Sequence, residues 1–103
     1  MMDSLGFKNW LDEAKADKSI KHRKDLVCRA NRVEREFKSY NKRFSLDREY
    51  KKDGGESLVK KLRFKGKALE NKPLNLPIGS NQMSDFATAV KAYFKYMSEK
   101  EDK

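Results

Sequence analysis

Apolar residues in this 103-residue chain recur at the spacing of one face of an α-helix, and no segment shows the alternation of a convincing strand. The first set follows the i, i+3, i+4, i+7 pattern and consists of Phe7, Trp10, Leu11 and Ala14. This set predicts a helix over residues 5–16, with Ser4 as its N-cap. Amphipathic helices bury their apolar faces by packing against one another, so the pattern predicts an all-α protein.

The second predicted helix is the longest, and its two faces differ sharply. Ser19 can cap it, and it should run from Ile20 to Phe37 or Tyr40. Its apolar stripe consists of Ile20, Leu26, Val27, Ala30, Val33 and Phe37. The opposite sector carries Lys21, Lys24, Cys28, Asn31, Arg32, Arg35 and Lys38. No acid lies inside that sector, and Glu34 falls nearer the buried side.

Two shorter helices are predicted in the middle of the chain. One begins at Ser45 and ends at Gly54 and Gly55, because consecutive glycines are a strong stop signal. The next should run from Glu56 to Phe64 or beyond. Its inward-facing residues are Leu58, Leu62 and Leu69.

The last part of the chain is a loop followed by a helix. Both prolines lie within residues 71–80, which therefore cannot be helical throughout. We expect this loop to pack against the body of the protein through Leu74, Leu76 and Ile78. A final helix is predicted from Gln82 or Ser84 to Met97. Its core stripe consists of Met83, Phe86, Val90, Tyr93, Phe94 and Met97.

These elements predict a compact bundle of four to five helices with a long basic second helix. We expect a single domain over residues 1–98 and a disordered polar tail over residues 99–103. Charged residues make up 40% of the chain, which by itself is typical of disordered segments. The aromatic residues recur at helical spacing, however, and this favours a folded domain with a thin core.

The positive charge is concentrated in the middle of the chain. Residues 21–72 carry eighteen Lys and Arg against eight Asp and Glu, whereas residues 1–20 are net negative and residues 73–103 are balanced. A field of this kind attracts a polyanion, and nucleic acid is the commonest one. The net charge of +9 is therefore accounted for by the central segment.

No arrangement of residues in the sequence suggests catalysis. The single histidine, His22, lies among cations without a carboxylate to orient it, so we interpret it as a surface or partly packed residue. The single cysteine, Cys28, excludes an internal disulfide and fits a reducing compartment. We expect a cytoplasmic protein that is not an enzyme, with no catalytic residue, metal site, cofactor or small-molecule substrate. No apolar run is long enough to span a membrane.

The order of elements resembles the N-terminal core-binding (SAM-like) domain of tyrosine recombinases, the phage integrases. The matching segments are Phe7-x-x-Trp10-Leu11, Lys18-Ser19-Ile20 with Asp25-Leu26, Val33-x-x-x-Phe37, and the closing helix Ala89–Met97. The resemblance implies a helical bundle that lies on one side of duplex DNA, opposite a catalytic domain absent from this chain. It also implies a role in DNA recombination or integration by a mobile element, with the second and fourth helices facing the DNA.

We therefore expect a duplex DNA-binding module. The predicted phosphate contacts are Lys21, Lys24, Arg32 and Arg35 on the second helix, and Lys60, Lys61, Arg63 and Lys65 on the fourth. Asn31 is a candidate for reading a base edge, because Asn can pair bidentately with adenine. If about six phosphates are neutralised, the affinity should fall ~10³-fold between 50 and 200 mM salt.

Three other readings of the basic segment remain open. The first is a protein-interaction or regulatory module that docks an acidic protein partner through its basic face, with the apolar loop over residues 74–78 as an anchor. The second is single-stranded nucleic acid stacked on Tyr40, Phe44 and Tyr50, although core or turn packing is the stronger interpretation of these aromatics. The third, binding to an anionic membrane surface, ranks last because the apolar face of the second helix is needed for the core.

Overall fold

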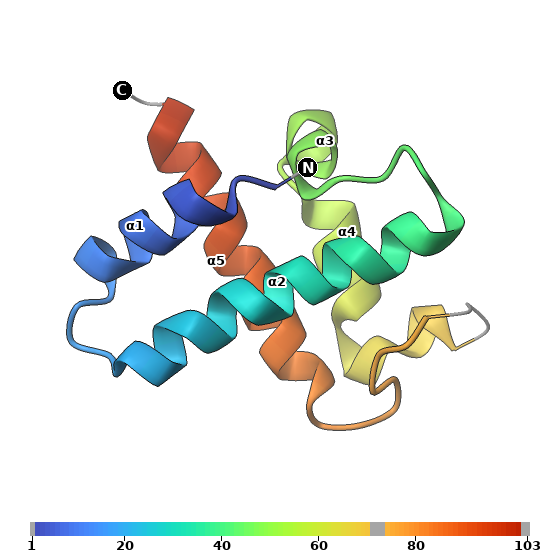
Figure 1. Ribbon diagram of the computed structural model, residues 1–103. Helices are drawn as coiled ribbons and strands as arrows, with labels where there is room; N and C mark the ends of the chain where they lie inside the picture. Colours follow the sequence, from blue (N-terminus) through green and yellow to red (C-terminus); the bar gives the residue numbers. More distant parts are fainter. Residues whose placement is uncertain (1, 71–73, 102–103) are drawn as a thin grey trace.

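The computed structural model describes residues 2–70 and 74–101, which fold as a bundle of helices (Figure 1). The predicted all-α class is confirmed. The elements are α1 (Ser4–Ala14), α2 (Ile20–Tyr40), α3 (Leu46–Asp53), α4 (Glu56–Leu62), the 3₁₀ helix η1 (Phe64–Leu69) and α5 (Met83–Glu101). The predicted start and end of the long second helix are also confirmed.

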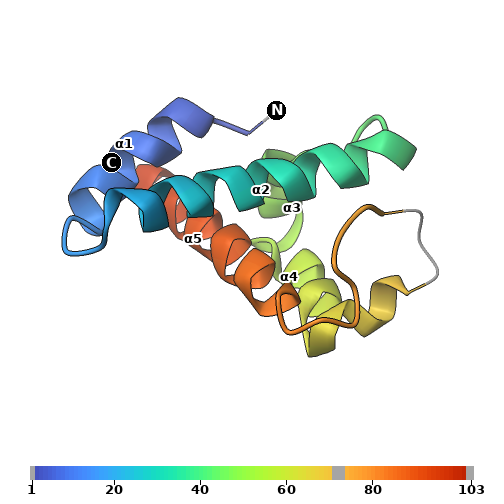
Figure 2. The same cartoon turned by 60° about the horizontal axis from the view of Figure 1, so that its bottom comes forward.

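The last helix, α5, is the centre of the bundle, and α1 to α4 and η1 all contact it. In Figure 1, α2 crosses in front of α5, while α4 runs beside α5 in the layer behind. Figure 2 shows the same arrangement from below, with α2 above the layer that contains α4 and α5. The exposed side of α2 therefore points away from that layer.

The core follows the predicted apolar stripes closely. All six predicted residues of α5 are buried, as are Leu58, Leu62 and Leu69. In α2 the stripe is buried at Leu26, Ala30, Val33 and Phe37. Two predicted core residues are instead exposed. Ile20 is 64% exposed because the start of α2 extends beyond α5, and Ala14 is exposed at the last residue of α1.

Side chains cap α1, α2 and α3, and the predicted cap Ser19 is confirmed. Ser19 accepts a hydrogen bond from the backbone N–H of His22, and Ser45 accepts one from that of Arg48. The N-cap of α1, however, is Asp3 and not Ser4, because the Asp3 carboxylate accepts the N–H of Gly6 at 3.0 Å. A carboxylate at this end of a helix also interacts favourably with the helix dipole.

The fourth helix ends earlier than predicted. It stops at Leu62, and the chain then enters the left-handed region at Phe64 (φ 55°), Lys65 (φ 59°) and Gly66 (φ 73°). This turn breaks the helix while leaving both Leu62 and Leu69 buried.

The loop after η1 packs against the body, as expected for its described part; residues 71–73, including Pro73, lie outside the described residues. Leu76 is buried and Leu74 and Ile78 pack against the core. The backbone of Asn75 is held from α2, since its carbonyl accepts a hydrogen bond from Arg32 Nη2 at 2.7 Å and its N–H donates to Glu36 Oε1 at 2.8 Å.

The final helix ends later than predicted, because α5 continues beyond Met97 to Glu101 and includes residues 99–101 of the expected polar tail. Trp10 Nε1 donates a hydrogen bond to Glu99 at 3.4 Å, and the Tyr50 hydroxyl donates one to Glu101 at 3.0 Å. These contacts give the additional turn of α5 partners on α1 and α3. Residues 102–103 of the predicted tail lie outside the described residues.

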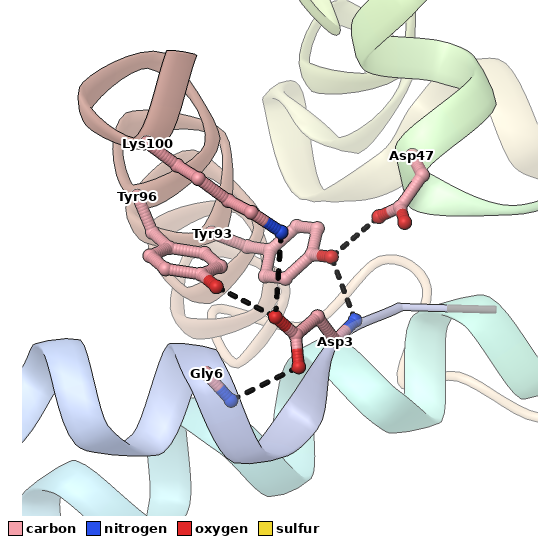
Figure 3. A network of polar contacts seen from close by, with 6 residues as sticks. All are labelled: Asp3, Gly6, Asp47, Tyr93, Tyr96 and Lys100. Carbon is pink, nitrogen blue, oxygen red and sulfur yellow. Dashed lines mark hydrogen bonds and ion pairs between the residues drawn. The ribbon is translucent and has the colours of Figure 1, made fainter. Parts of the chain in front are cut away.

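A polar network ties the start of the chain to α3 and α5 (Figure 3). The hydroxyl of the fully buried Tyr93 donates to the Asp47 carboxylate and accepts the N–H of Asp3 at 2.8 Å. The Tyr96 hydroxyl donates to Asp3 Oδ2 at 2.7 Å, and Lys100 Nζ lies 3.6 Å from the same oxygen.

The network shifts the acidities of its members. The hydrogen bonds from Tyr96 and from the Gly6 N–H lower the pKa of Asp3. Burial and the bond to Asp3 raise the pKa of Tyr96 to about 12. Burial and the Asp47 carboxylate also raise the pKa of Tyr93, which favours the neutral hydroxyl that donates to Asp47. The network therefore acts as a structural clamp.

Candidate nucleic-acid interface

Only some side chains on the basic face of α2 are exposed and free of contacts with other helices or loops. Lys21, Lys24 and Arg35 are exposed, and Arg35 Nε lies 3.8 Å from the carboxylate of its neighbour Glu36. Asn31 instead accepts a hydrogen bond from the Ser4 hydroxyl at 3.0 Å and so fixes the start of α1.

Arg32 also has structural partners on this face. Its guanidinium holds the Asn75 carbonyl and lies 5.4 Å from the centre of the Phe86 ring, where the π face attracts a cation. Asn31 and Arg32, the predicted base and phosphate contacts at the middle of α2, thus contact other parts of the fold. Within α2, the exposed cations Lys21, Lys24, Arg35 and Lys38 remain accessible to a partner.

The second predicted cluster is fully accessible. Lys60, Lys61, Arg63 and Lys65 are all exposed, and none of them forms an ion pair within the described part of the chain. The left-handed turn after α4 holds the backbone of Arg63 and Lys65 in place. In that turn the Gly66 N–H donates to the Arg63 carbonyl at 3.0 Å, and the Gly79 N–H donates to the Lys65 carbonyl at 2.6 Å.

A lysine of α5 joins this cluster. Two neighbouring cavities, of about 520 and 250 Å³, lie between α4, η1 and α5, and Arg63 and Lys91 line both. We refer to these two cavities together as the α4–α5 groove. Its polar or exposed lining residues are Gly54, Glu56, Lys60, Arg63, Phe64, Lys65, Asn81, Ser84, Thr88 and Lys91. Among these lining residues, Glu56 is the single carboxylate.

The sequence predictions did not include Lys91, because it lies in a segment of zero net charge. A usable signal was nevertheless present on the final helix. Its apolar stripe is matched by an opposite polar stripe at i, i+4, i+7, i+11, formed by Ser84, Thr88, Lys91 and Lys95. The structure leaves all four exposed.

The two basic surfaces lie on different sides of the molecule. Phe86 of α5 faces α2, since it lies against Arg32. Five residues later, Lys91 is rotated by about 140° around the helix axis. The side of α5 that lines the α4–α5 groove therefore differs from the side that contacts Arg32 of α2. The structure thus does not bring the predicted contacts of the second and fourth helices into one surface.

The aromatics considered for base stacking are used in packing where the structure describes them. Phe44 is buried and stacks on Phe37 with ring centres 4.9 Å apart, and Tyr50 stacks on Phe94 at 6.2 Å. The side chain of Tyr40 lies outside the described part of the structure. Packing is therefore confirmed as the role of Phe44 and Tyr50.

The remaining candidate groups stay separate from one another. His22 and Cys28 are both exposed on α2. Over residues 2–70 and 74–101, no group of three or more His, Cys, Asp or Glu side chains is placed to hold a metal ion. No helix in the described part of the chain has both the length and the apolar character needed to cross a membrane. Comparisons with protein-family models, with curated proteins and with solved structures found no match.

Proposed function

We propose that this protein is a helical module that binds duplex DNA through the α4–α5 groove. The observation that carries the proposal is the gathering of four exposed cations, Lys60, Arg63, Lys65 and Lys91, around one groove. Cations without a protein partner are free to neutralise phosphates, whereas paired cations would first have to give up their carboxylates.

Polar groups beside these cations extend the same chemistry. The groove also presents Asn81, Ser84 and Thr88, and side chains of these types commonly contact phosphate and sugar in protein–DNA interfaces. Such contacts position a protein on DNA without reading its sequence. We therefore expect binding to depend weakly on base sequence.

The proposal is tested with two matched charge reversals. The double variant R63E/K91E alters the groove, and K21E/K24E alters the exposed face of α2, on the other side of the bundle. Both double variants change the net charge by the same amount, so a general loss of positive charge affects them equally. Fluorescence anisotropy with a random 20-bp duplex should show that R63E/K91E loses binding and that K21E/K24E retains most of it. Loss of binding in K21E/K24E with binding retained in R63E/K91E would overturn the assignment of DNA binding to the groove.

The salt dependence provides a second readout. Neutralising about four phosphates predicts a slope near −3.6 for log K against log salt, so the affinity should fall ~10²-fold between 50 and 200 mM salt. This is less than the ~10³-fold expected for six phosphates, because the groove has fewer free cations than the whole basic segment. A flat salt response would contradict phosphate binding.

The resemblance to the core-binding domain of tyrosine recombinases stays a prediction, as does the absence of an enzymatic activity. From the resemblance we add one expectation to the proposal, namely that the module contacts the duplex from one side. The alternative, an acidic protein partner, loses its expected anchor, because Leu76 of the apolar loop is buried and its neighbours pack against the core. DNA binding is therefore the function that the geometry supports best.

A further inference from the structure

Phe64 is a large apolar side chain placed almost entirely in solvent. It is 86% exposed, although it lies between Leu62 and Leu69, which are both buried. Its backbone is left-handed, with φ of 55°, a conformation that costs energy for any bulky L-residue. Strained residues of this kind cluster at ligand sites, where the surrounding structure holds them in place.

The neighbouring contacts hold this conformation firmly. Gly66 is buried, and a Cβ at that position would come within 2.8 Å of Met83 Cε, so the chain passes close to α5. The two turn hydrogen bonds to the carbonyls of Arg63 and Lys65 fix the residues on each side of Phe64. Phe64 is thus exposed on a hydrogen-bonded turn, between two cations in the sequence.

The cavity beside this ring has the size and chemistry for a nucleotide. Its volume is about 520 Å³, within the range of small-molecule sites, and Phe64 forms part of its wall. The Ser84 hydroxyl donates to the Asn81 carbonyl at 2.8 Å, and the Thr88 hydroxyl donates to the Ser84 carbonyl at 2.9 Å. Both hydroxyl oxygens therefore remain available as acceptors for the N–H groups that every base carries on its edge.

We propose that this cavity holds one unpaired nucleotide of a DNA duplex, an inference that rests on the proposed function. The base stacks on Phe64, and its flanking phosphates contact Arg63, Lys65 and Lys91. Stacking on an aromatic side chain is tolerant of base identity. Taking a base out of a paired duplex costs energy, and a base that is already unpaired avoids most of that cost. The protein should therefore prefer a duplex with a bulged nucleotide to a fully paired one.

The test compares two 20-bp duplexes that differ by a single bulged nucleotide, at fixed salt. Anisotropy titrations should show that the natural protein binds the bulged duplex about 5- to 150-fold more tightly, the range for one stacked base. Phe64→Gly should abolish this difference while still binding the paired duplex, and Phe64→Trp should retain it. Ile20→Ala, which trims another exposed apolar residue, should leave both affinities unchanged.

Thermal unfolding separates a ligand role for Phe64 from a structural one. Glycine adopts φ of 55° without strain, so Phe64→Gly should raise the Tm or leave it unchanged. A fall of several degrees would show that the ring stabilises the fold and would overturn the proposal. Equal binding of both duplexes by the natural protein would overturn the unpaired-nucleotide site and leave DNA binding standing. Failure to bind either duplex at low salt would overturn both the unpaired-nucleotide site and the proposed DNA binding.

Free nucleotide is the other source of the same chemistry. A titration with adenosine monophosphate should show binding much weaker than to the bulged duplex, because a mononucleotide lacks the neighbouring phosphates. Equally tight binding of the mononucleotide would assign the cavity to a free ligand and overturn its assignment to nucleic acid.

Discussion

Replacing Tyr93 with Phe removes one oxygen atom from the centre of the polar clamp. The hydroxyl donates to the Asp47 carboxylate and accepts the N–H of Asp3, which links three segments distant in the sequence. The ring is fully buried and packs edge-on against Phe7 with centres 5.2 Å apart. Phe keeps this ring packing, so the variant reports on the hydroxyl alone.

The expected loss follows from the two hydrogen bonds. A bond to a charged acceptor contributes about 1.5–3 kcal/mol and a neutral one about 0.5–1.5 kcal/mol. The variant also leaves the N–H of Asp3 without its partner in a partly buried position. We therefore expect Tyr93→Phe to lower the free energy of unfolding by about 2–4 kcal/mol. For a domain of this size that corresponds to a fall in Tm of roughly 10–20 °C.

Urea and thermal unfolding followed by circular dichroism measure this loss. Tyr96→Phe is the matched control, because its hydroxyl makes one hydrogen bond, to Asp3 Oδ2, in a less buried position. Asp3 keeps its bond from Gly6 and its ion pair with Lys100 in that variant, so the cost should be nearer 1 kcal/mol. If Tyr93→Phe changed stability by less than about 0.5 kcal/mol, or cost less than Tyr96→Phe, the clamp would be refuted.

Three other perturbations have definite expected results. The pKa of Asp3 in the folded state is lowered below 3.8. The contribution of Asp3 to stability is therefore present above pH 3.8 and is lost as the pH falls through the folded-state pKa. Asp3→Asn should make the Tm less sensitive to pH in that acidic range, as measured by thermal unfolding. Gly55→Ala should destabilise the protein severely in chemical unfolding, because φ is 84° and the added Cβ would lie 2.2 Å from the Phe94 ring. Glu34 is buried, and its carboxylate accepts hydrogen bonds from the backbone N–H groups of Met2 and Leu46. Glu34→Ala should therefore lower the free energy of unfolding by about 3 kcal/mol. A variant with near-natural stability would contradict this role of Glu34.

The helices were predictable because their signals are local. The apolar period, Ser19 as a cap, and the glycine pair after α3 each act within a few residues, and the structure contains all of them. The errors came from contacts made at longer range. The extension of α5 to Glu101 depends on partners from α1 and α3, and the early end of α4 at Leu62 depends on the close approach of Gly66 to Met83.

The candidate site shows the same division. Lys60, Arg63 and Lys65 were identified from their clustering in the sequence, and they line the α4–α5 groove. A helical projection places Asn31 and Arg32 on an outward sector of α2, but it cannot show that Ser4 and the Asn75 loop return to bind them. Lys91 was missed for the converse reason, since it becomes part of the site through the packing of α5 against α4.

An NMR titration of ¹⁵N-labelled protein with a random 20-bp duplex, at low and at high salt, shows directly which surface binds DNA. Salt-sensitive shifts are expected at the α4–α5 groove, over residues 60–65 and at Lys91, with small changes over residues 21–38. Shifts confined to residues 21–38, or none at low salt, would contradict DNA binding through this groove.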